Sequence, residues 1–205
     1  MLRALLTGNG EVSSELLKKL SKNHTFLAAA DGGADKLLEA GIMPDAVVGD
    51  LDSVSAGARK KIPAERFFFV DNQNNTDLEK ALTFLTARGC KACTLVGFTG
   101  GRKDFSAGNL TTLFAFADKM DLCVLSDGWT IFPLTRTRSF ACEKGKRVSL
   151  IVLQTCQNVS LKGLKFPLKN TRLSFGTTRT LSNETTCKRF TISLKSGKML
   201  VYVED

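Results

Sequence analysis

The sequence has only one histidine, His24, among its 205 residues. Catalytic triads built on a histidine base are therefore not expected. A zinc site is disfavoured as well, because Cys90 and Cys93 form an isolated C-x-x-C pair without a second pair or histidines at ligand spacing. The six cysteines are interpreted as reduced thiols of an intracellular protein.

Long apolar runs are also lacking. No stretch of about 18 consecutive apolar residues occurs, so we expect no membrane-spanning helix and no membrane partner. The apolar start at Met1–Leu6 is too short for the core of a signal peptide, which favours a cytoplasmic location. Neither a Walker A motif nor a G-x-G-x-x-G fingerprint is present, which disfavours the common nucleotide-binding loops.

Charge divides the chain into two unlike parts. Residues 1–130 hold 15 basic and 16 acidic side chains, whereas residues 131–205 hold 14 basic and 4 acidic ones. The second part could attract nucleic acid or a small polyphosphate, or it could simply present a solvated basic surface. Its basic residues stand singly, without basic runs or interleaved aromatic residues, so a nucleic-acid partner is not expected.

The first part alternates short apolar runs with segments of helical spacing. This pattern predicts a parallel sheet covered by helices on both faces. Thr76 and Glu79 form a capping box, which predicts a helix beginning at Asp77. The expected strands are Leu2–Leu6, Phe26–Ala30, Ala46–Val48, Phe67–Val70, Thr94–Val96 and Leu122–Leu125, and the other expected helices include Ser14–Leu20 and Ala34–Ala40.

The second part shows short β-rich segments and no strong helical pattern. Val148–Leu153, Asn158–Leu161, Arg189–Leu194 and Met199–Val203 are the expected strands. We therefore predict an α/β fold class: an N-terminal parallel-sheet domain over residues 1–130, followed by a small all-β sandwich domain over residues 131–205. The boundary is expected near residues 127–136.

Carboxylates follow the expected strands in four separate loops. Ligands of parallel sheets bind at the carboxyl ends of strands. An extended chain would place Asp50 and Asp52 on the same side, about 6.5–7 Å apart at Cα. Aspartate also favours turns and caps, so one such loop would carry little weight. Four at one edge predict a site for Mg²⁺, which prefers oxygen ligands; the residues are Asp31, Asp50, Asp52, Asp77 and Asp104.

A glycine-rich turn, Gly97–Arg102, lies between an expected strand and a helix. Glycines let backbone N–H groups approach phosphate oxygens, and Arg102 adds positive charge. By itself such a segment is often only a turn. Beside the carboxylates it indicates metal-dependent phosphoryl or pyrophosphoryl transfer from a nucleotide.

Seven short segments, in this order, resemble the thiamine pyrophosphokinase family. The resemblance implies an α/β catalytic domain that binds nucleotide and metal, and a β-sandwich domain that binds thiamine. It also implies transfer of the pyrophosphoryl group of ATP to the thiamine hydroxyl, with Mg²⁺, giving thiamine diphosphate and AMP. The segments are Ala30–Ala34, Pro44–Asp45, Gly49–Ser53, Thr76–Ala81, Gly100–Asp104, Gly163–Leu168 and Ser182–Glu184.

The resemblance also implies roles for individual residues. It makes Asp50, Asp52, Asp77 and Arg102 catalytic, with Asp77 as the proposed base. The metal ligands would be Asp31, Asp50, Asp52 and Asp77, and the ATP contacts Asp31, Gly32, Gly100, Gly101, Arg102 and Asp104. The thiamine contacts would be Gln73, Asp77, Phe166, Ser182 and Asn183, the last three from the partner chain of a homodimer whose site lies at the subunit interface.

Two positions depart from the family pattern, and two other functions remain as alternatives. Phe105 stands where the family often has His, which removes a hydrogen bond there, and Phe166 stands where some members have Trp. A core position is the alternative for Phe166. The chain could instead be a related Mg-dependent pyrophosphokinase with another alcohol as acceptor, or a nucleic-acid-binding protein that uses its basic C-terminal part.

Overall fold

The computed structural model describes residues 2–205 and divides the chain into two compact units. The first unit extends to Ser126, and the second is Asp127–Asp205. The sequence places this boundary near residues 127–136, and the two units are described separately below. Among the described residues, no helix is both long enough and apolar enough to span a membrane.

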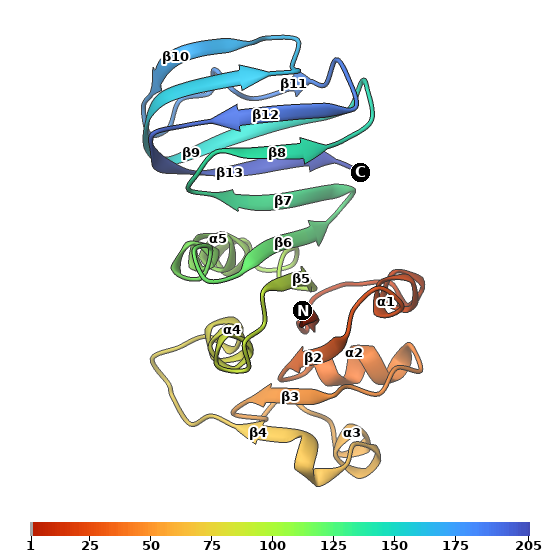
Figure 1. Cartoon of the computed structure of the whole chain (residues 1–205). Helices are drawn as coiled ribbons and strands as arrows, with labels where there is room; N and C mark the ends of the chain where they lie inside the picture. The colour runs from red at the N-terminus through yellow and green to blue at the C-terminus, as the bar shows by residue number, and fades with distance from the viewer. Residues whose placement is uncertain (1) are drawn as a thin grey trace. The chain divides into compact units, whose positions relative to one another are not determined.

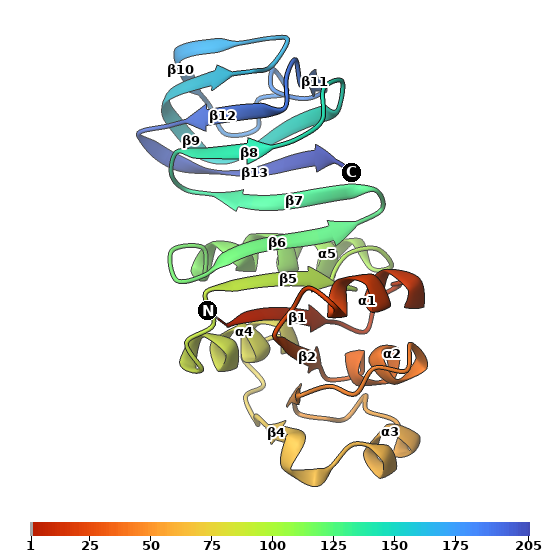
Figure 2. The ribbon, with the colours of Figure 1, turned by 45° about the vertical axis from the view of Figure 1, so that its right-hand side comes forward.

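The first unit is built on a parallel sheet (Figure 2). Its strands lie in the order β4-β3-β2-β1-β5-β6, and every neighbouring pair is parallel. The central strands are buried on both faces, since Ala4, Leu5 and Leu6 are fully inaccessible. The strand bounds are β1 Arg3–Thr7, β2 Phe26–Ala30, β3 Ala46–Gly49, β4 Phe67–Phe69, β5 Ala92–Val96 and β6 Asp121–Ser126.

Helices cover both faces of this sheet (Figure 1). Helices α1, α2 and α3 lie on one face, and α4 and α5 lie on the other. Helix α3, capped by the Ser55 hydroxyl, was not expected from the sequence. The bounds are α1 Ser14–Ser21, α2 Gly33–Glu39, α3 Ala56–Lys61, α4 Asp77–Ala87 and α5 Lys103–Thr112, with short 3₁₀ turns at Ala64–Arg66 and Leu113–Ala115.

The strand order creates a switch point between β1 and β5. The chain adds β2, β3 and β4 on one side of β1 and then returns to place β5 on the other side. The chain therefore continues from β1 and from β5 to helices on opposite faces of the sheet, and open α/β sheets bind ligands at such a point. Helix α2 approaches this edge closely, because a Cβ on Gly33 would lie 2.0 Å from the Thr7 carbonyl oxygen.

The second unit consists of antiparallel strands around one core. One ladder is β7-β13-β9-β11 and the other is β10-β9-β12-β8, so β9 belongs to both. Both ladders contribute to a single buried cluster, as expected for a sandwich. The bounds are β7 Trp129–Leu134, β8 Arg138–Ala141, β9 Arg147–Lys162, β10 Leu168–Leu173, β11 Asn183–Glu184, β12 Arg189–Ser193 and β13 Ser196–Glu204.

The prediction of two separate strands in the region of β9 is wrong. Val148–Leu153 and Asn158–Leu161 are parts of one strand of 16 residues. Asn158 has a positive φ of 53°, and the pairing register shifts nearby, so the strand bends from one ladder into the other without ending. A local pattern shows the interrupted alternation but not the partners that keep the chain extended.

Candidate active site

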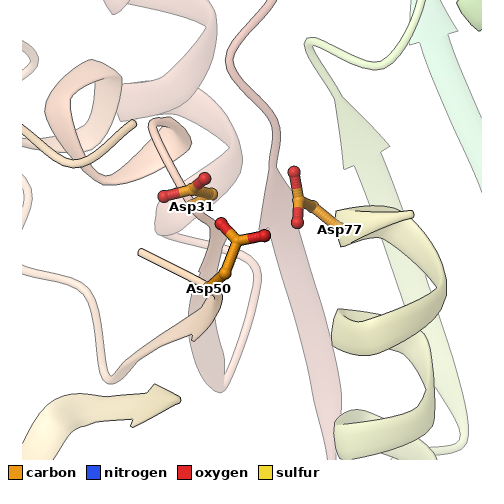
Figure 3. Close-up of side chains that lie close together, drawn as sticks. All are labelled: Asp31, Asp50 and Asp77. Carbon is orange, nitrogen blue, oxygen red and sulfur yellow. The ribbon is translucent and has the colours of Figure 1, made fainter. Parts of the chain in front are cut away.

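Three carboxylates meet at the carboxyl edge of the parallel sheet (Figure 3). Asp31 follows β2, Asp50 follows β3, and Asp77 begins α4. Each offers an oxygen atom within 4.8 Å of the oxygens offered by the other two. Asp31 and Asp50 lie close because β2 and β3 are parallel neighbours, and α4 begins at the same edge.

The start of α4 is fixed by local hydrogen bonds. The Thr76 hydroxyl accepts a hydrogen bond from the Glu79 backbone N–H at 3.3 Å, and the Glu79 carboxylate accepts one from the Thr76 N–H at 3.1 Å. The capping box predicted from the sequence is therefore confirmed. It holds Asp77 in the first helical turn, where the positive end of the helix dipole favours a carboxylate.

Lys80 places a buried ammonium beside two of these carboxylates. Its side chain is 3% exposed, and its Nζ lies 2.9 Å from Asp50 Oδ2 and 3.1 Å from Asp77 Oδ1. Burial acts to lower the pKa of Lys80, but the hydrogen bonds and charges of the two aspartates outweigh it and raise the pKa above its usual value. The hydrogen bond from Lys80 lowers the pKa of Asp50. Lys80 and Asp50 are thus ionised at neutral pH.

Asp31 is the least solvated carboxylate of the group. It is 3% exposed, and burial raises its pKa to about 6, with further increases from Asp77 and Asp52 and an opposing backbone hydrogen bond from Ser53. Its Oδ2 accepts that bond at 3.4 Å, while its buried Oδ1 has no hydrogen-bond partner. Buried polar oxygens normally have a partner. An unpartnered oxygen among converging carboxylates fits a hard divalent cation.

Asp52 lies beside this group and is not one of the three that converge. The extended geometry assumed for Asp50 and Asp52 is wrong, because Leu51 between them has a positive φ of 66°. Leu51 is 8% exposed and packs in the core beneath the loop, which turns the chain at this point. Asp52 still contacts the group, since its N–H donates to Asp50 Oδ1 at 3.4 Å.

Two of the three carboxylates border a pocket of about 490 Å³ at the switch point. Asp31, Gly32 and Asp77 line it together with the loops Gly8–Glu11 and Gly97–Arg102. The two loops are bound together, because the N–H groups of Gly8 and Gly10 donate to the Val96 and Gly97 carbonyl oxygens at 2.8 and 2.9 Å. A Cβ on Gly8 would lie 2.6 Å from the Gly97 oxygen, so side chains are excluded from this contact.

Arg102 and Asp104 form an exposed pair at the start of α5. Arg102 Nη2 lies 2.6 Å from Asp104 Oδ2, and the two side chains are 70% and 65% exposed. The Arg102 guanidinium also lies 4.2 Å from the centre of the Phe105 ring. Arg102 and Phe105 line the pocket, together with Gly100 and Gly101, whereas Asp104 does not. Phe105 thus supports Arg102 at the position where the resemblance leads one to expect a histidine.

The residues expected to contact thiamine differ in exposure. Gln73 is exposed, in the loop before α4, and does not line the pocket. In the second unit the Phe166 ring is 62% exposed, so the alternative of a core position is wrong. Ser182 is exposed as well, whereas Asn183 is only 5% exposed and its amide is hydrogen-bonded to the Phe166 backbone.

Two family models match the chain. The model described as "Thiamin pyrophosphokinase, catalytic domain" matches residues 17–124. The model described as "Thiamin pyrophosphokinase, vitamin B1 binding domain" matches residues 135–199. The chain belongs to the thiamin pyrophosphokinase family.

Relatives from several organisms carry the same family name. The thiamine pyrophosphokinase of Bacillus subtilis is 29% identical over 186 residues, covering 87% of this chain and 86% of the relative. Thiamine pyrophosphokinase 1 of rice is 30% identical over 155 residues, covering 68% and 58%. The crystal structure of the B. subtilis protein has a TM-score of 0.88 at 24% identity and covers 100% of this chain and 99% of its own, so the fold is shared. The structure from Geobacillus thermodenitrificans has a TM-score of 0.87 at 25% identity, covering 100% and 98%.

The two thiamin pyrophosphokinase models divide the candidate residues between them. Asp31, Asp50 and Asp77 lie in the part matched by the catalytic-domain model, together with Lys80. Phe166, Ser182 and Asn183 lie in the part matched by the vitamin B1 binding model. The carboxylates and the Gly97–Arg102 loop therefore belong to one domain model and the exposed aromatic ring to the other, whereas the Gly8–Glu11 loop precedes both matched regions.

Sequence reasoning missed two parts of the site. Lys80 follows Asp77 by three residues in a helix, a spacing that places both side chains on one face and could have revealed it. The Gly8–Glu11 loop follows the first strand, at the same sheet edge as the acidic loops, so the rule used for the aspartates also applied there. Both signals are weak until the strand order is known.

Proposed function

We propose that this chain catalyses transfer of the pyrophosphoryl group of ATP to the primary hydroxyl of thiamine, with Mg²⁺ bound by Asp31, Asp50 and Asp77. One observation carries the proposal: three carboxylates of the catalytic-domain part converge beside a glycine-lined pocket at the switch point of a parallel sheet. In the reaction the thiamine oxygen bonds to the β-phosphorus, the bond between that phosphorus and the oxygen bridging to the α-phosphorus breaks, and AMP leaves with that oxygen.

The chain supplies three elements for this reaction. The two glycine loops and Arg102 line a pocket, and we propose that the polyphosphate binds there, close to the loop backbone and the guanidinium. The acidic group binds the cation, which neutralises phosphate charge when present. We assign the proton of the thiamine hydroxyl to Asp77, because its side chain is 43% exposed on the pocket wall, against 23% for Asp50.

Lys80 holds the carboxylates of the acidic group together when no Mg²⁺ is bound. Three carboxylates within 4.8 Å repel one another, and the ammonium offsets part of this repulsion at Asp50 and Asp77. We propose that Lys80 orients these two side chains toward the cation. Asp52 is proposed as an additional ligand or orienting group next to Asp50, in line with the resemblance.

The resemblance further leads us to propose a homodimer, with thiamine bound by Gln73 and by Phe166 and Ser182 of the partner chain. Three large apolar side chains of the second unit, Phe166, Phe175 and Leu181, are 62%, 70% and 44% exposed, which supports an association surface there. Light scattering coupled to gel filtration tests the dimer. Cytoplasmic location and the lack of a nucleic-acid partner stay predictions.

The deciding experiment supplies purified protein with ATP, Mg²⁺ and thiamine and separates the nucleotides formed. We expect AMP and thiamine diphosphate in equal amounts, and no product when thiamine or Mg²⁺ is left out. Formation of ADP, or AMP formation that ignores thiamine, would contradict the proposal. A panel of other primary alcohols in place of thiamine separates this function from a related pyrophosphokinase with a different acceptor.

A further inference from the structure

A short backbone ladder supports the segment that carries Phe166. The Thr186 N–H donates to the Gly163 carbonyl oxygen at 3.0 Å, and the Lys165 N–H donates to the Glu184 oxygen at 2.8 Å. Between them, Leu164 and Thr185 form an antiparallel bridge. The segment before Phe166 is thus fixed by ordinary backbone pairing.

The ladder cannot continue to Phe166 by backbone pairing. Ser182, two residues before Glu184 on the opposite segment, has a positive φ of 55°, and its N–H donates to the Ser149 hydroxyl at 2.9 Å. On the other side Phe166 is followed by Pro167, which has no N–H group and restricts the backbone of the residue before it. Both chains leave the ladder at this point.

The Asn183 side chain replaces the missing rung. Its Oδ1 accepts a hydrogen bond from the Phe166 N–H at 3.0 Å, and its Nδ2 donates to the Phe166 carbonyl oxygen at 2.9 Å. A side-chain amide has the same donor and acceptor as a peptide group, so it pairs with both polar groups of Phe166. Oδ1 also accepts from the Glu184 N–H at 2.9 Å, which occupies its second lone pair.

The neighbouring Ser182 shows the opposite arrangement. Its side chain is exposed, and within residues 2–205 its hydroxyl makes no hydrogen bond, so it is available to a ligand. The Asn183 amide is buried, at 5% exposure, and both lone pairs of its oxygen are used inside the protein. The two adjacent residues therefore have different capacities for contact with a substrate.

We infer that Asn183 is a positioning residue that holds Phe166 in place as a platform for the flat rings of thiamine, of which the thiazolium is cationic, and that it does not itself contact the substrate. The inference rests on the proposed function for the identity of the ligand. An exposed ring on a fixed backbone loses little conformational freedom when a ligand stacks on it, and this preserves binding energy. Ser182 keeps the direct contact.

A double-mutant cycle tests whether Asn183 acts through Phe166. We expect Asn183→Ala to raise the KM for thiamine about three- to fivefold and no further than Phe166→Ala does, with kcat and the KM for ATP nearly unchanged. In a Phe166→Ala background the same change should have no further effect. The matched neighbour is Ser182: the changes in KM caused by Ser182→Ala and by Phe166→Ala should multiply in the double variant. If the changes caused by Asn183→Ala and Phe166→Ala also multiply, the inference is wrong.

A spectroscopic test does not require thiamine to be the substrate. Trp129 is the only tryptophan, so a Trp129→Phe, Phe166→Trp protein reports the motion of the ring at position 166 alone. Asn183→Asp keeps the acceptor oxygens but replaces the donor that faces the Phe166 carbonyl. We expect it to lower the fluorescence anisotropy, whereas Ser182→Ala leaves it unchanged.

The outcomes separate this inference from the proposed function. If Asn183→Asp lowers the anisotropy but thiamine yields no product, the proposed function fails and the positioning role stands. If the anisotropy is unchanged in a protein whose circular dichroism matches that of the parent, the positioning role is wrong whatever the acceptor is. Asn183→Asp also serves if Asn183→Ala proves too unstable to assay.

Discussion

The two units of this chain hold their candidate functional groups by different means. In the first unit the groups are charged, and their side chains are 3–43% exposed. They are held by contacts with one another and by their places at the ends of β2 and β3 and at the start of α4. In the second unit the group of interest is a ring that is 62% exposed, fixed only through its backbone. We therefore propose that the first unit determines the rate of the chemical step and that the second determines how well the acceptor binds.

The largest effect is expected for Asp50→Asn. Loss of a carboxylate from the acidic group should lower kcat by about 10³-fold or more, while the KM for thiamine changes little and the fold is retained. Asp121→Asn is the matched control, because Asp121 begins β6 at the opposite edge of the sheet. If the Asp50 variant changed the KM for thiamine but kept its kcat, the assignment of the chemical step to the first unit would be wrong.

Lys80→Met tests whether the acidic group needs its internal cation. The change leaves Asp50 and Asp77 close together without a counter-charge, so we expect a loss of about 1–3 kcal/mol in the free energy of unfolding in EDTA, reduced from the cost of a fully buried pair because both aspartates are partly exposed. Mg²⁺ should restore part of the loss. Urea melts with and without Mg²⁺ measure both effects.

Lys36→Met is the control for this change. Lys36 pairs with Glu39 at 3.8 Å on the surface of α2, with side chains 33% and 64% exposed, so its loss should cost less than about 0.5 kcal/mol. An equal cost for both variants would show that the site ammonium has no special role in the first unit.

Asp31→Asn should stabilise the metal-free protein while removing activity. Burial raises the pKa of Asp31 to about 6 in the folded state, above its usual value of 3.8. The folded state therefore gains from protonation at low pH, and this contribution is lost as the pH rises through about 6. Asparagine removes the charge. In EDTA we therefore expect the variant to exceed the parent protein in its free energy of unfolding by about 1–2 kcal/mol more at pH 7.5 than at pH 4. A gain that is equal at both pH values would contradict the assignment.

Phe166→Ala gives the smallest expected effect and tests the role of the second unit. We expect the KM for thiamine to rise roughly three- to tenfold with little change in kcat, because stacking on an exposed ring contributes about 1 kcal/mol. Phe175→Ala is the control, since that ring is also exposed, at 70%, but lies outside the Asn183 ladder. A fall in kcat alone would place Phe166 with the chemical step and remove the distinction between the units.

Local sequence features determined much of the first unit. The start of α4 at Asp77 follows from Thr76 and Glu79, which are three residues apart and need no distant partner. The strand Phe26–Ala30 was predicted with its observed bounds. Apolar runs and capping residues act within a few positions, so a sequence displays them directly. The convergence of Asp31, Asp50 and Asp77 followed once the sheet was taken as parallel.

Tertiary structure alone decided the finer arrangement. The turn at Leu51 moves Asp52 away from the converging group because the core beneath it takes the leucine side chain. Lys80 acquires its role only when β3 brings Asp50 to the side of α4, and Asn183 acquires its own because the Phe166 backbone lacks another partner. These contacts join residues 17 to 30 positions apart in the chain, and their energies depend on burial and strand order, which no local pattern contains.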